Sequence, residues 1–216
     1  MTVTKYTREF FPNLQTLFVY SRDDELFEDD KRIIARKIQT IPYYVNGKEK
    51  NQFEQWTNKK CSEIIFDSDK DDWRKKTSVF DDKLMNKNNL AFIVEEENNN
   101  KFGYYFNGTI TKTDGSFMKA EGSFLFSLKS NGRLNGMYKF EEKEGCFGFD
   151  VDDKSSGCLW DLHCGLCIMK ENKKSSCEIC EHSYIFDLHD LSDVFLSNSH
   201  EWVEFTPKRL TVIEMN

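Results

Sequence analysis

Four dipeptides that favour tight turns divide the middle of this chain into short segments. Asn, Asp and Gly adopt positive φ angles more readily than other residues, and two-residue hairpin turns require such angles. Turn signals at this spacing predict antiparallel strands joined by hairpins. The dipeptides are Asn107-Gly108, Asp114-Gly115, Asn131-Gly132 and Asn135-Gly136.

Strand-like runs lie between and beyond these turns. The run at 122–130 places Phe124, Phe126 and Leu128 on one face at a period of two, although Leu125 on the other face is apolar as well. Short strands at close spacing are typical of an antiparallel sandwich or barrel rather than of parallel βαβ units. The predicted strands lie within residues 90–96, 101–110, 122–130, 136–142, 146–151, 159–170, 183–188 and 209–215.

Helical patterns are confined to two places. Residues 23–41 carry an apolar stripe, with acidic residues early and basic residues late, as the helix dipole favours. Because Pro42 disfavours the helical conformation in the residue before it, this helix should end at or before Ile41. The second pattern follows the acidic stretch FDSDKDDW, where Trp73 and later apolar residues fall on one helical stripe. We expect that helix to begin within the acidic stretch itself.

The alternating aspartates of FDSDKDDW also raise the hypothesis of a calcium loop. Counted from Asp67, positions 1, 3 and 5 are aspartates, as an EF-hand loop requires. Position 6 is Asp72 instead of Gly, and position 12 is Ser78 instead of a bidentate Glu. The stretch is therefore predicted to be a strand-to-helix junction that binds no ion.

The order and spacing of these segments resemble a known family. Residues 63–110 contain an apolar strand, the acidic turn, the Trp- and Phe-bearing helical pattern and a strand followed by Lys-Phe-Gly. Residues 122–133 contain the FLFSL strand, and the pattern continues through 146–151 and 158–170 to the closing strand at 204–215. This arrangement resembles the TLDc domain of oxidation-resistance proteins, in a version similar to those of amoebozoan parasites.

The resemblance implies a mainly β (α+β) fold, namely a TLDc-like antiparallel β-sandwich with short flanking helices. This agrees with the strands expected from the turn signals. The resemblance covers about residues 61–215, so we expect the β-sandwich domain at 61–216. Residues 1–60 lie outside it and are expected to form a helical N-terminal extension.

The same resemblance implies a non-enzymatic interaction module in the oxidative-stress response, with a vacuolar proton pump subunit as protein partner. It assigns no catalytic, cofactor-binding or metal-binding residue. The chain departs from many family members in two places. Tyr104 and Tyr105 follow Gly103 where those members carry paired glycines, and residues 152–157 replace a glycine-rich stretch. Both departures count against a direct transfer of pump binding from those members to this chain.

The late cysteines give an independent hypothesis. Two CxxC pairs separated by nine residues have the spacing of a tetrahedral zinc site, and a histidine flanks each pair. Four thiolates would bind one ion if both turns converge. The residues are His163, Cys164, Cys167, Cys177, Cys180 and His182.

A plain hairpin centred at residue 172 is the competing geometry. It would place Cys164 opposite Cys180 and Cys167 opposite Cys177, and residues three apart on a strand point to opposite faces. The four thiols would then not meet at one ion, and the cross-strand pairs would be suited to reversible oxidation. Zinc binding and thiol redox chemistry both remain as alternatives to the interaction function.

Charge and hydropathy argue against other classes of function. The chain has 30 Lys and Arg against 37 Asp and Glu, and this net charge of −7 argues against nucleic-acid binding. No apolar run approaches the roughly 18 residues of a membrane-spanning helix, and the N-terminus lacks a secretory apolar region. We expect a cytoplasmic protein that does not insert into a membrane, with its seven cysteines in a reducing compartment.

Motifs of the common enzyme classes are missing from the sequence. No GxSxG, P-loop, GxGxxG or HExxH pattern occurs. His189 and His200 lie among acidic residues, and without a recognisable nucleophile they are predicted to belong to a polar surface loop. The sequence therefore predicts no enzyme activity.

Overall fold

The chain forms two compact units, Met1–Ile41 and Pro42–Asn216. A computed structural model describes residues 2–6, 17–21, 46–131, 134–141, 148–163, 166–171, 173–177 and 203–216. In the first unit, β1 (Thr2–Tyr6) and β2 (Leu17–Ser21) pair as an antiparallel hairpin. The helix predicted at 23–41 lies outside the described residues.

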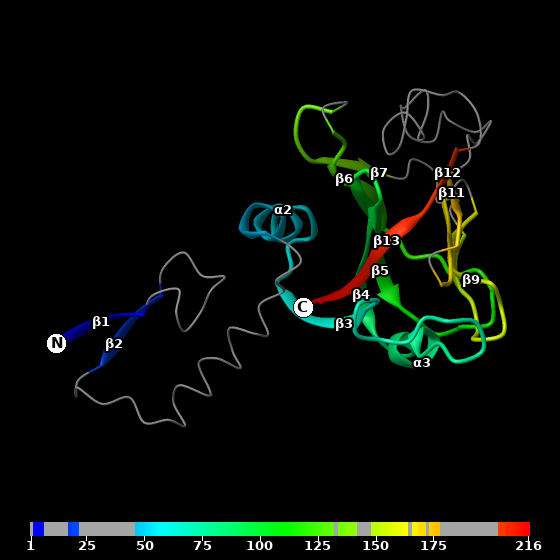
Figure 1. Ribbon diagram of the computed structural model, residues 1–216, viewed down its shortest axis with the longest axis horizontal. Helices are drawn as coiled ribbons and strands as arrows, with labels where there is room; N and C mark the ends of the chain where they lie inside the picture. The colour runs from blue at the N-terminus through cyan, green and yellow to red at the C-terminus, as the bar shows by residue number, and fades with distance from the viewer. Residues whose placement is uncertain are drawn as a thin grey trace. The chain divides into compact units, whose positions relative to one another are not determined.

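The second unit contains two antiparallel sheets (Figure 1). This confirms the predicted mainly β, antiparallel architecture. The six-stranded sheet consists, in spatial order, of β3 (Cys61–Asp67), β13 (Pro207–Met215), β4 (Asn88–Glu96), β5 (Lys101–Thr109), β6 (Phe124–Lys129) and β7 (Tyr138–Glu141). The five-stranded sheet consists of β12 (Val203–Phe205), β11 (Ser175–Cys177), β10 (Leu166–Met169), β9 (Cys158–Leu162) and β8 (Phe149–Val151).

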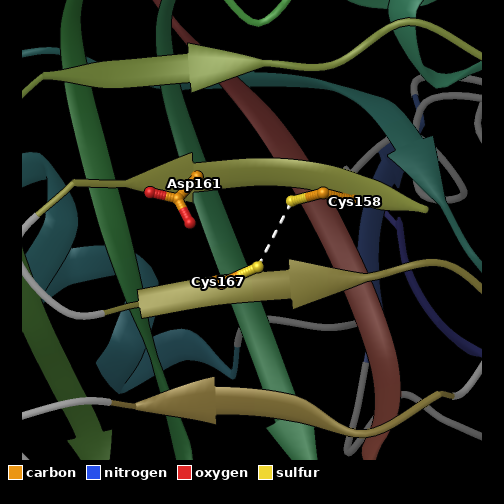
Figure 2. A group of neighbouring side chains, drawn as sticks. All are labelled: Cys158, Asp161 and Cys167. Atoms are coloured by element: carbon orange, nitrogen blue, oxygen red, sulfur yellow. Dashed lines mark hydrogen bonds between the residues drawn. The ribbon is translucent and has the colours of Figure 1, made fainter. Parts of the chain in front are cut away.

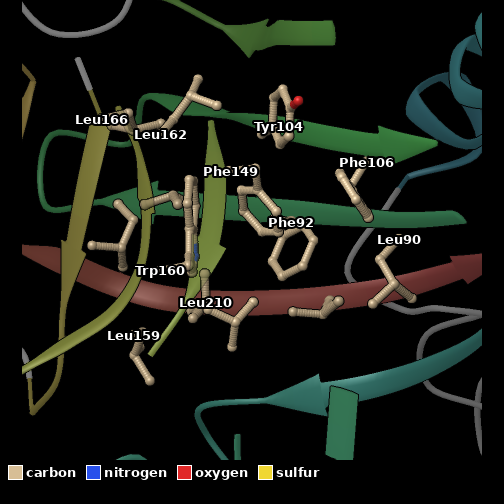
Figure 3. Close-up of a cluster of buried hydrophobic side chains, with 14 of the residues drawn as sticks. Leu90, Phe92, Tyr104, Phe106, Phe149, Leu159, Trp160, Leu162, Leu166 and Leu210 are labelled. Atoms are coloured by element: carbon tan, nitrogen blue, oxygen red, sulfur yellow. The ribbon is translucent and has the colours of Figure 1, made fainter. Parts of the chain in front are cut away.

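The main core lies between the two sheets. Leu90, Phe92 and Val94 alternate along β4, are fully buried, and belong to this core. The Phe92 ring centroid lies 4.9 Å from that of Phe149 on β8 and 5.6 Å from that of Trp160 on β9. Figure 3 shows these rings together among strands of both sheets. Side chains of the two sheets thus form one sandwich core.

A second core covers the opposite face of the six-stranded sheet, where α2 (Gly47–Thr57) packs (Figure 1). The ring centroid of Phe53 on this helix lies 4.8 Å from that of Phe126 on β6. Phe124 and Phe126 belong to this second core, whereas Leu125 belongs to the main core. Both faces of β6 are therefore buried, which explains why the FLFSL run is apolar on both sides.

Hydrogen bonds at its ends explain why α2 forms. The Asn46 side chain accepts hydrogen bonds from the N–H groups of Lys48 and Glu49, and the Glu49 carboxylate accepts one from the Asn46 N–H. This capping box satisfies N–H groups that lack partners within the helix. Asn58 ends the helix in the left-handed conformation, with a φ of 54°. Apolar periodicity does not predict α2, because Phe53 is the one apolar residue that it fully buries.

The prediction that a helix begins within FDSDKDDW is wrong. Turns follow β3, and α3 spans only Phe80–Leu84. The aspartates explain why no helix forms there. The Asp67 carboxylate accepts a hydrogen bond from the Asp69 N–H, and the Asp72 carboxylate accepts one from the Arg74 N–H. Such local bonds satisfy backbone donors without a helix.

The predicted turn at Asn107-Gly108 is also wrong, because both residues lie within β5. The Asn107 N–H and side-chain amide donate hydrogen bonds to the segment that precedes β6, which holds this part of the chain in the sheet. The β4–β5 hairpin instead turns after Glu96, whose carboxylate accepts from the Asn100 N–H. Asn99 in this turn has a φ of 63°.

The remaining predicted strands agree with the structure except in one run. Residues 159–170 form two strands, β9 and β10, with His163 in the turn after β9. The strand predicted at 183–188 lies outside the described residues.

Candidate functional site

Three side chains able to bind a metal meet on the five-stranded sheet (Figure 2). Cys167 on β10 lies opposite Asp161 on β9 in the strand register. The sulfur atoms of Cys158 and Cys167 are 3.4 Å apart and share a hydrogen bond. One ligand atom from each of the three residues lies within 4.8 Å of the other two. We call these residues, all of them half-buried, the thiol cluster.

A β-bulge brings Cys158 into this cluster. Cys158 and Trp160 pair with consecutive residues of β10, so Leu159 between them is an extra residue with no register partner on β10. In a regular strand, side chains alternate, and Cys158 would share the core face with Trp160. The extra residue reverses the alternation and directs Cys158 to the face of Cys167.

The surroundings of Cys158 favour a neutral thiol. Its sulfur lies 3.2 Å from the carbonyl oxygen of Trp160 and 3.3 Å from that of Ile168, and each oxygen is placed to accept a hydrogen bond from the thiol. The hydrogen bond shared with Cys167 raises the pKa of Cys158 far above its usual value, and burial and nearby negative charges raise it further. Cys158 therefore keeps its proton at neutral pH.

Two more aspartates lie beside the thiol cluster. Asp150 on β8 is the register partner of Asp161, and Asp152 follows shortly after the strand. Asp150 is 7% exposed. Burial, followed by the charges of Asp161 and Asp152, raises the pKa of Asp150 to about 7. The accumulated carboxylates make this part of the sheet attractive to cations.

A buried lysine holds the start of β9 in place. Lys170 follows β10, and its ammonium group donates hydrogen bonds to the backbone oxygens of Ser156, at 3.1 Å, and of Asp153. Burial lowers the pKa of Lys170, and neighbouring negative charges partly oppose this. Because these bonds tie the β8–β9 loop to the end of β10, they fix the position of Cys158.

The structure corrects the predicted arrangement of the late cysteines. β10 and β11 form an antiparallel hairpin, but Cys167 pairs with Ser176, and Cys177 pairs with Leu166. Cys177 is fully buried in the main core, whereas Cys167 is half-buried on the other face. A register shifted by one residue reverses the facing of a side chain, so the Cys167–Cys177 pair and a zinc site made of all four cysteines are both contradicted.

The other residues of that hypothesis are placed only in part. Cys164, Cys180 and His182 lie outside the described residues, as do His189 and His200. His163 is exposed, and its ring packs edge-on against Phe117 with 4.7 Å between centroids.

Sequence patterns missed two of the three cluster residues. Asp161 lies within the run predicted as one strand and Cys158 directly precedes it, and the residue types there do not locate the bulge. A carboxylate and a cysteine near the predicted hairpin are the one available signal, and it does not indicate which face each side chain takes. The CxxC spacing points to Cys167, whereas its partner comes from the preceding strand.

The acidic stretch is held by basic side chains. The Arg209 guanidinium donates to both carboxylate oxygens of Asp67, at 2.9 and 3.0 Å, and forms an ion pair with Asp69 at 2.9 Å. Lys83 forms an ion pair with Asp71 at 2.7 Å. The stretch therefore joins β3 to β13 and to α3.

Comparison with known proteins gives one family. A search of curated proteins finds no match. Among the described residues, no helix is long and apolar enough to cross a membrane. A family model of the TLDc domain matches residues 36–206, which is most of the chain and includes every strand of the two sheets except β13. The chain therefore belongs to the TLDc domain family.

Proposed function

We propose that this TLDc module is a non-enzymatic interaction domain that acts in the oxidative-stress response in the cytoplasm. The family match over residues 36–206 is the observation that supports it most, since TLDc domains are in general interaction modules. We further propose a subunit of the vacuolar proton pump as the protein partner.

Phe117 is a candidate contact residue for such a partner. Its side chain is 50% exposed, the highest value among the large apolar residues that the structure describes. The Phe117 ring packs against the His163 ring in an edge-to-face arrangement, and it also lies close to the Gly148 backbone. A ring fixed on one side and open on the other offers apolar area at low entropic cost, and aromatic side chains are enriched at the centres of protein interfaces.

Binding of the purified chain to a purified vacuolar proton pump tests the proposal. We expect a stable complex, and we expect Phe117→Ser to weaken it about tenfold or more, as the loss of a central interface residue does. Tyr138→Ser, which removes another exposed aromatic ring, is the matched control. Failure of the unmodified chain to bind would reject the pump as partner.

A second measurement tests the interaction function itself. Affinity capture from cytosol of oxidant-treated cells should recover a stable protein partner that Phe117→Ser loses. If no stable partner is recovered and the chain turns over a substrate in a broad screen, the non-enzymatic interaction function is overturned.

A further inference from the structure

We propose that Cys158, Cys167 and Asp161 bind a zinc ion, with a water molecule as the fourth ligand. Two thiols and one carboxylate form a donor set of mixed softness, which zinc accepts, whereas calcium and magnesium prefer oxygen ligands alone. This site uses one residue of the CxxC pairs and two residues from the preceding strand. It goes beyond the interaction function and does not depend on it.

The spacing of the donor atoms fits a tetrahedral ion. Zinc–sulfur bonds of about 2.3 Å place two sulfurs in a tetrahedral site about 3.8 Å apart. The sulfur atoms of Cys158 and Cys167 are 3.4 Å apart, and a carboxylate oxygen of Asp161 completes a triangle with edges below 4.8 Å (Figure 2). Small side-chain shifts are therefore enough to complete the site.

A disulfide between the two cysteines fits the same positions less well. It would require the sulfurs to approach to about 2.05 Å. Cys158 and Cys167 are not register partners, since Cys158 pairs with Met169 and Cys167 pairs with Asp161. The diagonal placement across a bulge favours a shared ligand over a direct bond.

The charges around the site favour a divalent cation. Binding displaces one proton from each thiol to the solvent, and two thiolates with one carboxylate leave the zinc complex with a single negative charge. Asp152, whose charge acts on Cys158, adds negative potential that attracts the free cation. The buried ammonium group of Lys170, which interacts with the charges of Cys158 and Asp152, offsets the remaining negative charge once the ion is bound.

A cobalt and zinc titration of the full chain tests the site. The protein is reduced, freed of metal with a chelator, and titrated with Co²⁺, whose complexes with thiolates absorb light by charge transfer. We expect one equivalent of Co²⁺ to produce this band, with release of two protons per ion. One equivalent of Zn²⁺ should then abolish the band by displacement.

Variants locate the ion within the chain. Cys158→Ser and Cys167→Ser should each lower zinc affinity more than about 100-fold, which is the upper end of the loss caused by removing an outer-shell partner. Asp161→Asn retains both thiols and the side-chain shape, and it should weaken binding about tenfold or more while the cobalt band persists. Circular dichroism confirms that each variant is folded.

Two controls separate this site from other thiols. Cys61→Ser alters a half-buried thiol of the six-stranded sheet, 3.6 Å from the Met215 sulfur, and should leave affinity unchanged. The double variant Cys164→Ser/Cys180→Ser should also bind zinc as the unmodified chain does. Binding that survives Cys158→Ser, binding lost in the double variant, or the absence of a thiolate band would each overturn the proposal.

Discussion

At the residue scale, Gly103 shows how closely the central strands approach. A Cβ atom at this position would lie 1.8 Å from the Phe92 carbonyl oxygen on β4 and 2.9 Å from the Phe126 ring on β6. The first contact is with the backbone of a central strand, so no change of side-chain rotamer removes it. Glycine at this position is a requirement of packing between strands.

We predict that Gly103→Ala destabilises the protein by about 3 kcal/mol or more, at the upper end of the cost of overpacking a core. The urea midpoint of unfolding measures the change. Gly47→Ala is the matched control, because a Cβ there meets no atom within 4 Å. Equal midpoints for the two variants would contradict the predicted strand approach.

The thiol cluster shows, at the same scale, where prediction from sequence stops. The CxxC spacing identified Cys167 as chemically interesting. It did not identify Cys158 as its partner, because the position of the bulge at Leu159 depends on the packing of β9 against β10. Register likewise decides that Cys177 faces the core, and one residue of shift reverses that outcome.

At the element scale, the turn dipeptides and period-two runs predicted most strands of the sandwich. β4, β5, β6 and β13 lie within one or two residues of their predicted positions. The helices were harder to predict. α2 depends on the capping box at Asn46 and on a few aromatic contacts, and the local hydrogen bonds of the aspartates after β3 replaced the first turns of the expected helix.

The junction between β3 and β13 gives the prediction at this scale. Arg209 and Asp67 are mostly buried, with side chains 17% and 3% exposed, and Arg209→Ala leaves the Asp67 charge in a poorly solvated site. We expect a loss of about 3 kcal/mol in the free energy of unfolding, as for other broken buried pairs. Chemical denaturation measures it.

An exposed ion pair is the control for that variant. Lys174 and Glu204 lie 2.8 Å apart with side chains 70% and 52% exposed, so Lys174→Ala should cost less than about 1 kcal/mol. Similar losses in Arg209→Ala and Lys174→Ala would show that burial does not set the strength of the Arg209–Asp67 pair.

At the scale of the whole molecule, the six-stranded sheet is covered on both faces. The five-stranded sheet buries one face, and α2 buries the other through the second core. The family resemblance predicted the sandwich from residue 61 onward, whereas the helix that completes the second core precedes that residue. Apolar residues on both faces of β6 were the sequence signal for such a cover, since a sheet exposed on one face carries polar residues there.

Two truncations test the contribution of α2. Deletion of residues 1–41 removes the first compact unit and should leave the denaturation midpoint of the second unchanged. Deletion of residues 1–60 also removes Phe53, whose ring is fully buried against β6. The loss of a buried Phe alone costs about 3–5 kcal/mol, so the shorter chain should unfold at lower urea concentration and expose an apolar sheet face. Binding of a hydrophobic dye and light scattering detect that apolar surface. Equal stability of the two truncated chains would show that the sandwich does not need α2.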